Sequence, residues 1–282
     1  MNILSIQSHV AYGHVGNSAA VFMLQRLGVE VWPIHTVQFS NHTGYETWRG
    51  RAFEAGHIRE LVQGLGERDA LEKCDGVLSG YIGSAAIGEA VLDAVAQVKQ
   101  ANPEAVYCCD PVIGDIGRGA FVPPEVAEFM RRHAVAAADI VTPNHFELEH
   151  LAGREVRTLD DARAAIEELR GRGPRAVVVT SLATEDTPVD AVDVVACNAS
   201  GCYRLRTPKL RVAAHGAGDA FAALFLAHHL RTRSLAEALS CAASSLFGVL
   251  QKTMTLNRQE MALVAAQDEL IDPSTTFHAE PV

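Results

Sequence analysis

A short glycine-containing segment, Gly216-Ala217-Gly218-Asp219, combines groups that are suited to phosphoryl transfer. It lies in the stretch 212–227, where an alanine, leucine and phenylalanine run predicts a buried helix over 219–230. The first N–H groups of a helix lack partners within it, and the helix dipole adds positive charge, so a phosphate could bind there. Asp219 would repel a phosphate but could accept the proton of an attacking hydroxyl. The alternative is ordinary N-capping beside a glycine turn.

The composition limits the class of protein. The chain has 282 residues, of which 48% are hydrophobic and 21% charged, so it can form a large core in one α/β domain or in two smaller ones. The formal net charge of -10 argues against nucleic acid or an anionic membrane as the main partner. A phosphate-bearing substrate remains compatible with this charge, because local dipoles and a metal ion can outweigh it.

The cysteines and the N-terminal residues indicate the compartment. We find no Cys-x-x-Cys pair, zinc spacing or disulfide framework, and adjacent cysteines in an apolar run are expected to be buried thiols. Residues 1–7 have no basic leader, and no apolar stretch approaches membrane-spanning length. We therefore expect a soluble cytoplasmic protein. The cysteines are Cys74, Cys108, Cys109, Cys197, Cys202 and Cys241.

Strands and helices are predicted to alternate along the chain, with short connections. The predicted strands are 2–7, 29–37, 76–80, 105–109, 139–142 and 176–180, with a hairpin formed by 192–197 and 202–206. The predicted helices are 18–27, 58–65, 84–101, 123–132, 160–170, 219–230, 235–250 and 258–270. Residues 272–282 are expected to form a tail, and no linker or repeat divides the chain, so we expect one domain over 1–282.

This alternation predicts an α/β fold with three layers, in which helices cover both faces of a mostly parallel sheet. Ligands of such sheets bind beyond the carboxyl ends of the strands. Polar segments lie at these ends, and a single crevice is expected to collect them with the glycine-containing segment. They are Ser8, 39–45, Asp110, 144–147 and 180–181.

Several of these segments together resemble the pyridoxal kinases, a branch of the ribokinase-like superfamily. The resemblance extends from residue 2 to about residue 250. The loop around Ser8 and the stretch 38–45 are specific to this branch, whereas Gly216-Ala217-Gly218-Asp219 is shared with the wider superfamily. The remaining motifs are Val15-Gly16-Asn17, Ser79-Gly80-Tyr81, Cys109-Asp110-Pro111-Val112 and Thr142-Pro143-Asn144 with Glu147.

The resemblance implies a ribokinase-like fold without a large separate lid, and transfer of the γ-phosphoryl group of ATP to the 5′-hydroxymethyl group of pyridoxal. It also implies a homodimer. Asp219 would accept the hydroxyl proton, and the amides of Gly216, Ala217 and Gly218 would bind the moving phosphoryl group. Asp110 and Glu147 would hold Mg²⁺ or its waters, since a hard cation prefers oxygen ligands. Alternatively, Asp110 is a turn residue before proline, and Glu147 a solvated carboxylate in the first turn of a helix.

The family places two further groups of residues around the substrates. Around the pyridine ring it places polar groups, which would bond the ring nitrogen and the 3-hydroxyl, and apolar or aromatic side chains, which would cover the ring faces. These residues are Ser8, Val15, Phe39, His42, Thr43, Gly44 and Tyr81. Around ATP, besides Asp110, Glu147, Gly216 and Gly218, it places Thr142, Asn144, Thr180, Ser181, Pro208, Lys209 and Leu210. His42 could equally be structural, and Thr142 and Asn144 could cap a helix.

Three features depart from the family or extend it. Some relatives have lysine at the position of Thr180, so metal ions must neutralise more phosphate charge here, and a monovalent cation such as K⁺ could contribute. Ala217 replaces a common threonine and His215 precedes the turn, but neither removes a backbone amide. Residues 112–120 contain three glycines and are predicted to form a flap over ATP, with Arg118 near a phosphate, unless they are only a surface loop.

Two other functions remain open. Hydroxymethylpyrimidine is also a small heteroaromatic ring with a hydroxymethyl group, although Ser8 and the stretch 38–45 favour pyridoxal. A non-catalytic binder of pyridoxal phosphate is the alternative from another class, and the retained Asp219, Asp110 and Glu147 argue against it.

Overall fold

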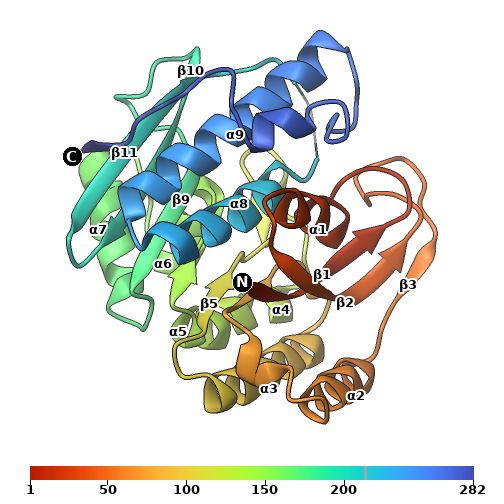
Figure 1. Cartoon of the computed structure of the whole chain (residues 1–282). Coiled ribbons are helices and arrows are strands. Elements are labelled where there is room, and N and C mark those ends of the chain that lie inside the picture. The colour runs from red at the N-terminus through yellow and green to blue at the C-terminus, as the bar shows by residue number, and fades with distance from the viewer. Residues whose placement is uncertain (213–214) are drawn as a thin grey trace.

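A ten-stranded sheet forms the middle layer of the computed structural model, which describes residues 1–212 and 215–282. Ala213 and Ala214, which belong to the stretch 212–227, lie outside the described residues. The strand order is β12-β11-β10-β9-β8-β5-β4-β1-β2-β3. The strands from β9 to β2 in this order are parallel to one another, whereas β10 pairs antiparallel with β9 and β3 pairs antiparallel with β2. The predicted mostly parallel sheet is therefore confirmed (Figure 1).

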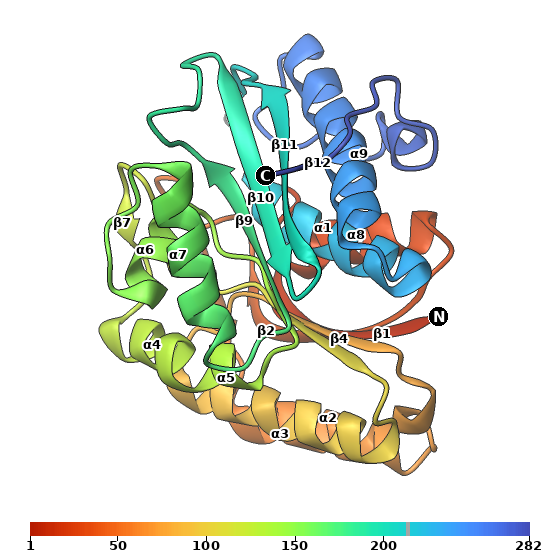
Figure 2. The ribbon, with the colours of Figure 1, turned by 90° about the vertical axis from the view of Figure 1, so that its left-hand side faces the viewer.

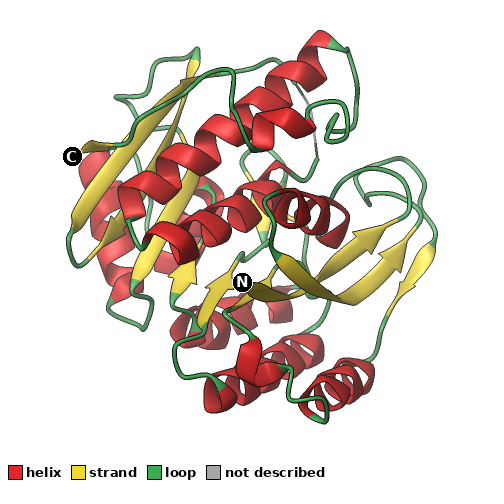
Figure 3. Cartoon of the chain, in the orientation of Figure 1, coloured by secondary structure: helices red, strands yellow, loops and turns green. Residues whose placement is uncertain are grey.

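The observed elements follow the predicted order closely. The strands are β1 (Asn2–Val10), β2 (Glu30–Phe39), β3 (Gly50–Ala52), β4 (Gly76–Ser79), β5 (Val106–Cys109), β6 (Gly114–Asp115), β7 (Gly119–Ala120), β8 (Ile140–Val141), β9 (Ala176–Leu182), β10 (Ala191–Asn198), β11 (Gly201–Pro208) and β12 (Glu280–Pro281). The helices are α1 (Asn17–Arg26), α2 (Ala55–Gly66), α3 (Ala85–Ala101), α4 (Pro124–Phe129), α5 (Val135–Ala137), α6 (His145–Ala152), α7 (Leu159–Arg170), α8 (Ala217–Thr232) and α9 (Leu235–Thr255). Figure 3 shows their distribution between the layers.

Helices cover both faces of the sheet and create two hydrophobic cores. Neighbouring residues on a strand point to opposite faces, so Val77 on β4 belongs to the core with α2 and α3, whereas Leu78 belongs to the core with α1, α8 and α9. Figure 2 shows α2 and α3 on one side of the sheet and α8 and α9 on the other. The three-layer α/β/α prediction is confirmed, and no large separate lid is present among the described residues.

The C-terminal part of the chain differs most from the prediction. The helix predicted over 258–270 is wrong, because only the short 3-10 helix Gln267–Leu270 forms there. Met261 and Leu263 are buried from irregular turns, so their apolar spacing reflects core contacts and not a helical period. Residues 280–281 form β12 and pair with β11, so the expected tail includes a strand of the sheet.

The hairpin of β10 and β11 contains a disulfide that was not predicted. Cys197 and Cys202 stand opposite each other in this pair and are bonded, so the expectation that the cysteines form no disulfide is wrong. The predicted hairpin already placed the two cysteines at opposing positions, which was the signal available in the sequence. Cys108 and Cys109 are buried free thiols, as expected.

Candidate functional site

One cavity of about 710 Å³ brings together every residue that the sequence predicted for the site. It lies beyond the carboxyl ends of the parallel strands, where Ser8 of β1, Phe39 of β2 and Asp110 after β5 reach it. Its volume is typical of a small-molecule site. No helix in the described part of the chain is long and apolar enough to cross a membrane.

The glycine-containing turn lies at the start of α8, which begins at Ala217 and not at Asp219 as predicted. Gly216 is the N-cap with φ of 84°, a conformation that favours glycine. A Cβ atom at Gly216 would lie 2.0 Å from the carbonyl oxygen of His14, so the close packing also requires glycine. The turn therefore directs the first N–H groups of α8 into the cavity, together with Asp219 in the first turn.

Asp219 lines the cavity and is held by one backbone contact. Its carboxylate accepts a hydrogen bond from the N–H of Gly16 in the loop after β1, which stabilises the charged form. Burial acts in the opposite direction and dominates, raising the pKa of Asp219 to about 6. The carboxylate is thus charged at neutral pH while remaining basic enough to accept a proton.

Asp110 lies directly after β5 and is buried. The hydroxyl of Thr142 donates a hydrogen bond of 3.1 Å to its Oδ1. Burial and the negative charges of Glu147 and Asp219 raise the pKa of Asp110 well above its usual value. Asp110 is therefore part of a concentrated group of carboxylates and not a simple turn residue.

Glu147 and Asn144 form the N-terminal cap of α6. Asn144 Oδ1 accepts the N–H of Glu147 at 3.0 Å, and Glu147 Oε2 accepts the N–H of Asn144 at 2.9 Å, which is a capping box. Glu147 Oε1 also accepts the N–H of Ile113 at 2.7 Å. Burial, opposed by these backbone donors, raises the pKa of Glu147 to about 7. The alternative of a solvated Glu147 is wrong, whereas the capping role of Asn144 is confirmed.

The buried carboxylates could hold a cation only with help from other ligands. No group of three or more His, Cys, Asp or Glu side chains in the described residues is arranged to hold a metal ion. Both oxygens of Glu147 already accept backbone N–H groups, while Asp110 Oδ2 would lie 3.9 Å from a Cβ atom at Gly218 and so faces the glycine turn. Mg²⁺ commonly binds one or two carboxylates and takes its other ligands from water and phosphates, which fits this arrangement.

The part of the cavity near β1 and β2 is aromatic. Phe39 packs against Trp48, with ring centroids 4.6 Å apart, and Tyr81, Val15 and Ser8 line the cavity near it. Thr43 and Gly44 belong to the loop that follows Phe39 and also line the cavity. This region could accept a flat heteroaromatic ring.

His42 has a fixed orientation in this region. Its Nδ1 accepts the N–H of Gly44 at 3.0 Å, and its ring stacks on His215 with centroids 4.0 Å apart. Burial and the proximity of His215 lower the pKa of His42 to about 4, so the ring is neutral at pH 7. With Nδ1 as an acceptor, the proton of the neutral ring is on Nε2, which is left to donate to a ligand.

The opposite part of the cavity is formed by β9, β11 and the helices α8 and α9. Thr180 and Ser181 reach it from β9, and Ser181 has φ of 49°, which is uncommon for a residue with a side chain. Pro208, Lys209 and Leu210 line it at the end of β11. Sequence reasoning missed the apolar residues from β10, α8 and α9, because they follow the spacing of ordinary core residues: Val192, Val194, Phe221, Ala243, Leu246, Phe247 and Leu250.

The glycine-rich segment 112–120 forms the hairpin of β6 and β7 beside the cavity. Asn144 Nδ2 donates to the carbonyl of Gly114 at 2.8 Å, so the base of the hairpin is tied to the cap of α6. Val112, before the hairpin, has φ of 47°, a strained conformation for a β-branched residue, and it lines the cavity. Arg118 at the exposed end also lines it.

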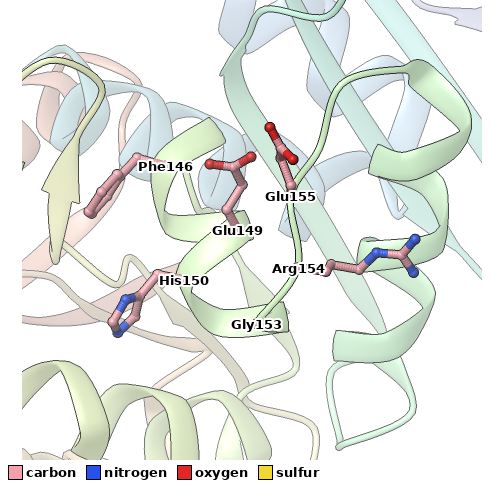
Figure 4. Close-up of a pocket in the computed structure, with 6 residues that line it drawn as sticks. All are labelled: Phe146, Glu149, His150, Gly153, Arg154 and Glu155. Atoms are coloured by element: carbon pink, nitrogen blue, oxygen red, sulfur yellow. The ribbon is translucent and has the colours of Figure 1, made fainter.

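A second hollow of about 370 Å³ lies on the outer side of α6 (Figure 4). Its charged groups take part in local contacts. Glu149 Oε1 accepts the N–H of Val156 at 2.7 Å, and Arg154 lies 4.0 Å from Asp161. None of its residues was predicted individually for the site, although Phe146 belongs to the segment 144–147 at the end of a strand. We assign no chemistry to this hollow, which is lined by Phe146, Glu149, His150, Gly153, Arg154 and Glu155.

Known proteins resemble the chain over its whole length. Residues 70–263 match the family model described as phosphomethylpyrimidine kinase. The chain is 55% identical to pyridoxal kinase PdxY of Rubrobacter xylanophilus over 98% of this chain and 96% of the relative. It is 46% identical to pyridoxal kinase PdxY of Corynebacterium diphtheriae over 100% of both. A solved structure of pyridoxal kinase from Leishmania donovani with ADP and pyridoxamine has a TM-score of 0.91 at 32% identity, covering 100% of this chain and 99% of that one.

Proposed function

Because the chain belongs to the pyridoxal kinase family and is an enzyme of that family, we propose that its cavity transfers the γ-phosphoryl group of ATP to the 5′-hydroxymethyl group of pyridoxal. The product would be pyridoxal 5′-phosphate, as in the salvage of vitamin B6. Pyridoxine and pyridoxamine carry the same hydroxymethyl group and are further candidate substrates.

A single observation supports this proposal most strongly. Three carboxylates from separate elements, Asp110, Glu147 and Asp219, face one cavity together with the N-terminus of α8. Phosphoryl transfer needs a base for the acceptor, donors for the moving group and a cation for the triphosphate, and little covalent work by the protein. An aromatic region on one side and an apolar region on the other leave separate places for a pyridine ring and a nucleotide.

Asp219 and the start of α8 act on the reacting groups in the proposed mechanism. Asp219 takes the proton of the 5′-hydroxyl as the hydroxyl oxygen bonds to the γ-phosphorus and the bond from that phosphorus to the leaving ADP breaks. The pKa of about 6 keeps this carboxylate ionised at neutral pH. The N–H groups of Gly216, Ala217 and Gly218 donate to the transferring phosphoryl oxygens, and the partial positive charge of the helix start stabilises them.

Asp110 and Glu147 are the proposed carboxylates for Mg²⁺ or for its bound waters. Burial and the negative charges of Glu147 and Asp219 raise the pKa of Asp110, and a cation at this position would relieve the repulsion between these charges. Bound Mg²⁺ would neutralise charge on the ATP phosphates. Thr180 is neutral, and we propose that a monovalent cation such as K⁺ supplies some of the charge that a lysine would provide.

The remaining predicted residues divide between the two substrates. Ser8, Thr43 and His42 Nε2 would bond the polar groups of the pyridine ring, between the apolar faces of Val15, Phe39 and Tyr81. Thr142, Asn144, Thr180 and Ser181 would position the phosphates. Pro208, Lys209 and Leu210 would border the adenine.

Three organisational features are also proposed. The continuous sheet from β12 to β3 supports treating residues 1–282 as one kinase domain. We propose a homodimer by analogy with the family, and a cytoplasmic location because ATP is the proposed donor. The Cys197–Cys202 disulfide is an observation against a cytoplasmic location, because such bonds are rare in reducing compartments.

A competition assay tests the function. Purified protein with ATP and Mg²⁺ should phosphorylate pyridoxal with a higher kcat/KM than hydroxymethylpyrimidine. The phosphomethylpyrimidine kinase model that matches residues 70–263 makes the pyrimidine the second candidate, and faster turnover of it would replace our choice. Tight binding of pyridoxal phosphate without any ATP-dependent product would instead indicate a binder.

A further inference from the structure

Glu260 is a buried carboxylate that does not line the cavity but is bonded to two loops that do. The hydroxyl of Tyr45 donates a 2.5 Å hydrogen bond to its Oε1, and the N–H of His14 donates to its Oε2 at 3.2 Å. Tyr45 follows the cavity residues His42, Thr43 and Gly44. Glu260 therefore joins the loop after β2 and the loop after β1 to the segment that follows α9.

The loop after β1 is fitted closely around this carboxylate. Gly13 has φ of 93°, which favours glycine, and a Cβ atom there would lie 2.3 Å from Glu260 Oε2, so a side chain at this position would displace the carboxylate. The next peptide, His14, gives its N–H to Glu260 and packs its carbonyl oxygen against Gly216. The N–H of Gly16, in the same loop, bonds Asp219.

These contacts connect Glu260 to the substrate side of the reaction through two routes. Through Tyr45 it holds the loop that carries His42, Thr43 and Gly44. Through His14 it holds the loop on which the turn before α8 rests. The Tyr45 route passes through none of the residues proposed for the nucleotide, whereas the His14 route reaches Gly216, which is proposed to bind the moving phosphoryl group. Loss of the Tyr45 contact alone should thus disturb the acceptor substrate and not ATP, whereas loss of the whole carboxylate should also disturb the turn before α8.

We propose that Glu260 is a positioning residue. Through Tyr45 it fixes the loop 42–44, which binds the acceptor substrate, and through His14 it fixes the turn 216–219, which carries the base. The proposal rests on the function proposed above, since it concerns binding of the pyridoxal acceptor. It assigns a role to a residue 215 positions away from Tyr45 in the sequence.

The test separates the two substrates kinetically. Tyr45→Phe removes only the hydroxyl, and we expect the pyridoxal KM to rise about tenfold, as for loss of a hydrogen bond to a charged group, with the ATP KM changed less than twofold. Glu260→Ala should raise the pyridoxal KM at least as much and also lower kcat, whereas Glu260→Gln, which keeps an acceptor, should restore most of the affinity. The double variant Tyr45→Phe/Glu260→Ala should have the same pyridoxal KM as Glu260→Ala alone, because the hydroxyl then has no partner left to lose.

Matched controls come from the same regions. Tyr12 is exposed and lies 6.4 Å from the ring of Tyr45, so Tyr12→Phe removes a hydroxyl without touching Glu260. Glu269 accepts the N–H of Ser274 at 2.8 Å in the same C-terminal segment, so Glu269→Ala reports on general loosening there. Both controls should leave the two KM values unchanged.

The outcomes are distinct. If the wild-type protein phosphorylates pyridoxal but Tyr45→Phe leaves the pyridoxal KM unchanged, the inference about Glu260 is wrong and the proposed function stands. Equal rises of the pyridoxal KM and the ATP KM in Tyr45→Phe would have the same meaning. Tyr45→Phe keeps the ring and the fold, so this result stands even if Glu260→Ala fails to fold. A wild-type protein that does not phosphorylate pyridoxal would overturn the proposed function and this inference with it.

Discussion

The carboxylate of Asp219 lies close enough to that of Asp110 for its negative charge to raise the pKa of Asp110. One stands in the first turn of α8 and the other directly after β5, so the two come together only because the helix starts above the end of that strand. The repulsion between the two carboxylates destabilises the protein when no cation is bound. A cation bound between the strands and the helix would relieve this repulsion and could at the same time neutralise the phosphates.

Replacing the base should abolish most turnover without preventing nucleotide binding. For Asp219→Asn we expect kcat to fall by about 10²- to 10⁴-fold, because the hydroxyl loses its proton acceptor. ATP affinity, measured by calorimetry, should change little. Asp160→Asn is the matched control, since Asp160 is also in the first turn of a helix but is exposed. A loss of less than threefold in kcat would remove Asp219 from the role of base.

The activity should depend on pH through the same carboxylate. Asp219 must be deprotonated to act, and burial raises its pKa to about 6, so kcat/KM should fall as the pH drops below about 6. An ordinary aspartate would place this limb near pH 4. A pH profile measured with saturating Mg²⁺ and ATP checks this, and a flat profile between pH 5 and 7 would contradict it.

The stability of the folded protein should also depend on pH through Asp219, but here ionisation of the carboxylate is unfavourable. Because the folded pKa of Asp219 exceeds the unfolded value, the folded state binds more protons between about pH 4 and 6, and this contribution is lost as the pH rises through that window. At pH 8, Asp219→Asn should therefore have a higher Tm than the wild-type protein, with the difference shrinking toward pH 4. Thermal unfolding at the two pH values measures it, and an equal difference at both would show that the carboxylate is not destabilising.

Asp110 should control the response to Mg²⁺. In Asp110→Asn the side chain keeps its shape and can still accept from Thr142, but one negative charge is lost, so we expect a rise of about tenfold or more in the Mg²⁺ concentration needed for half-maximal activity. The pyridoxal KM should change little. An unaltered Mg²⁺ titration would exclude Asp110 from the metal site.

Nucleotide should protect the β6–β7 hairpin from proteolysis. Arg118 is exposed at its end and gives trypsin a cleavage point. If the hairpin closes over ATP, a non-hydrolysable ATP analogue with Mg²⁺ should slow cleavage after Arg118 several-fold, while cleavage at exposed Arg68 in another loop continues at its usual rate. Equal cleavage at Arg118 with and without nucleotide would contradict closure.

The sequence alone determined the layers and the location of the site. Strand–helix alternation follows from local periodicity, and parallel strands necessarily bring their carboxyl ends together, so Ser8, Phe39, Asp110 and Thr180 could be assigned to one crevice from their positions at the strand ends. The glycine-containing turn could be recognised because its requirement for unusual backbone angles restricts the residue type, as the φ of 84° at Gly216 shows.

Only the tertiary structure decided which residues support that crevice. Glu260 reaches Tyr45, Trp48 packs behind Phe39, and Met261 is buried without a helix, and none of these contacts leaves a periodic trace in the local sequence. The charged state of Asp219 was likewise undetermined, because it depends on burial and on the N–H of Gly16, a residue brought near by the packing of the loop after β1 on α8. Local patterns record the backbone and the buried face of each element, whereas such contacts depend on how distant elements pack.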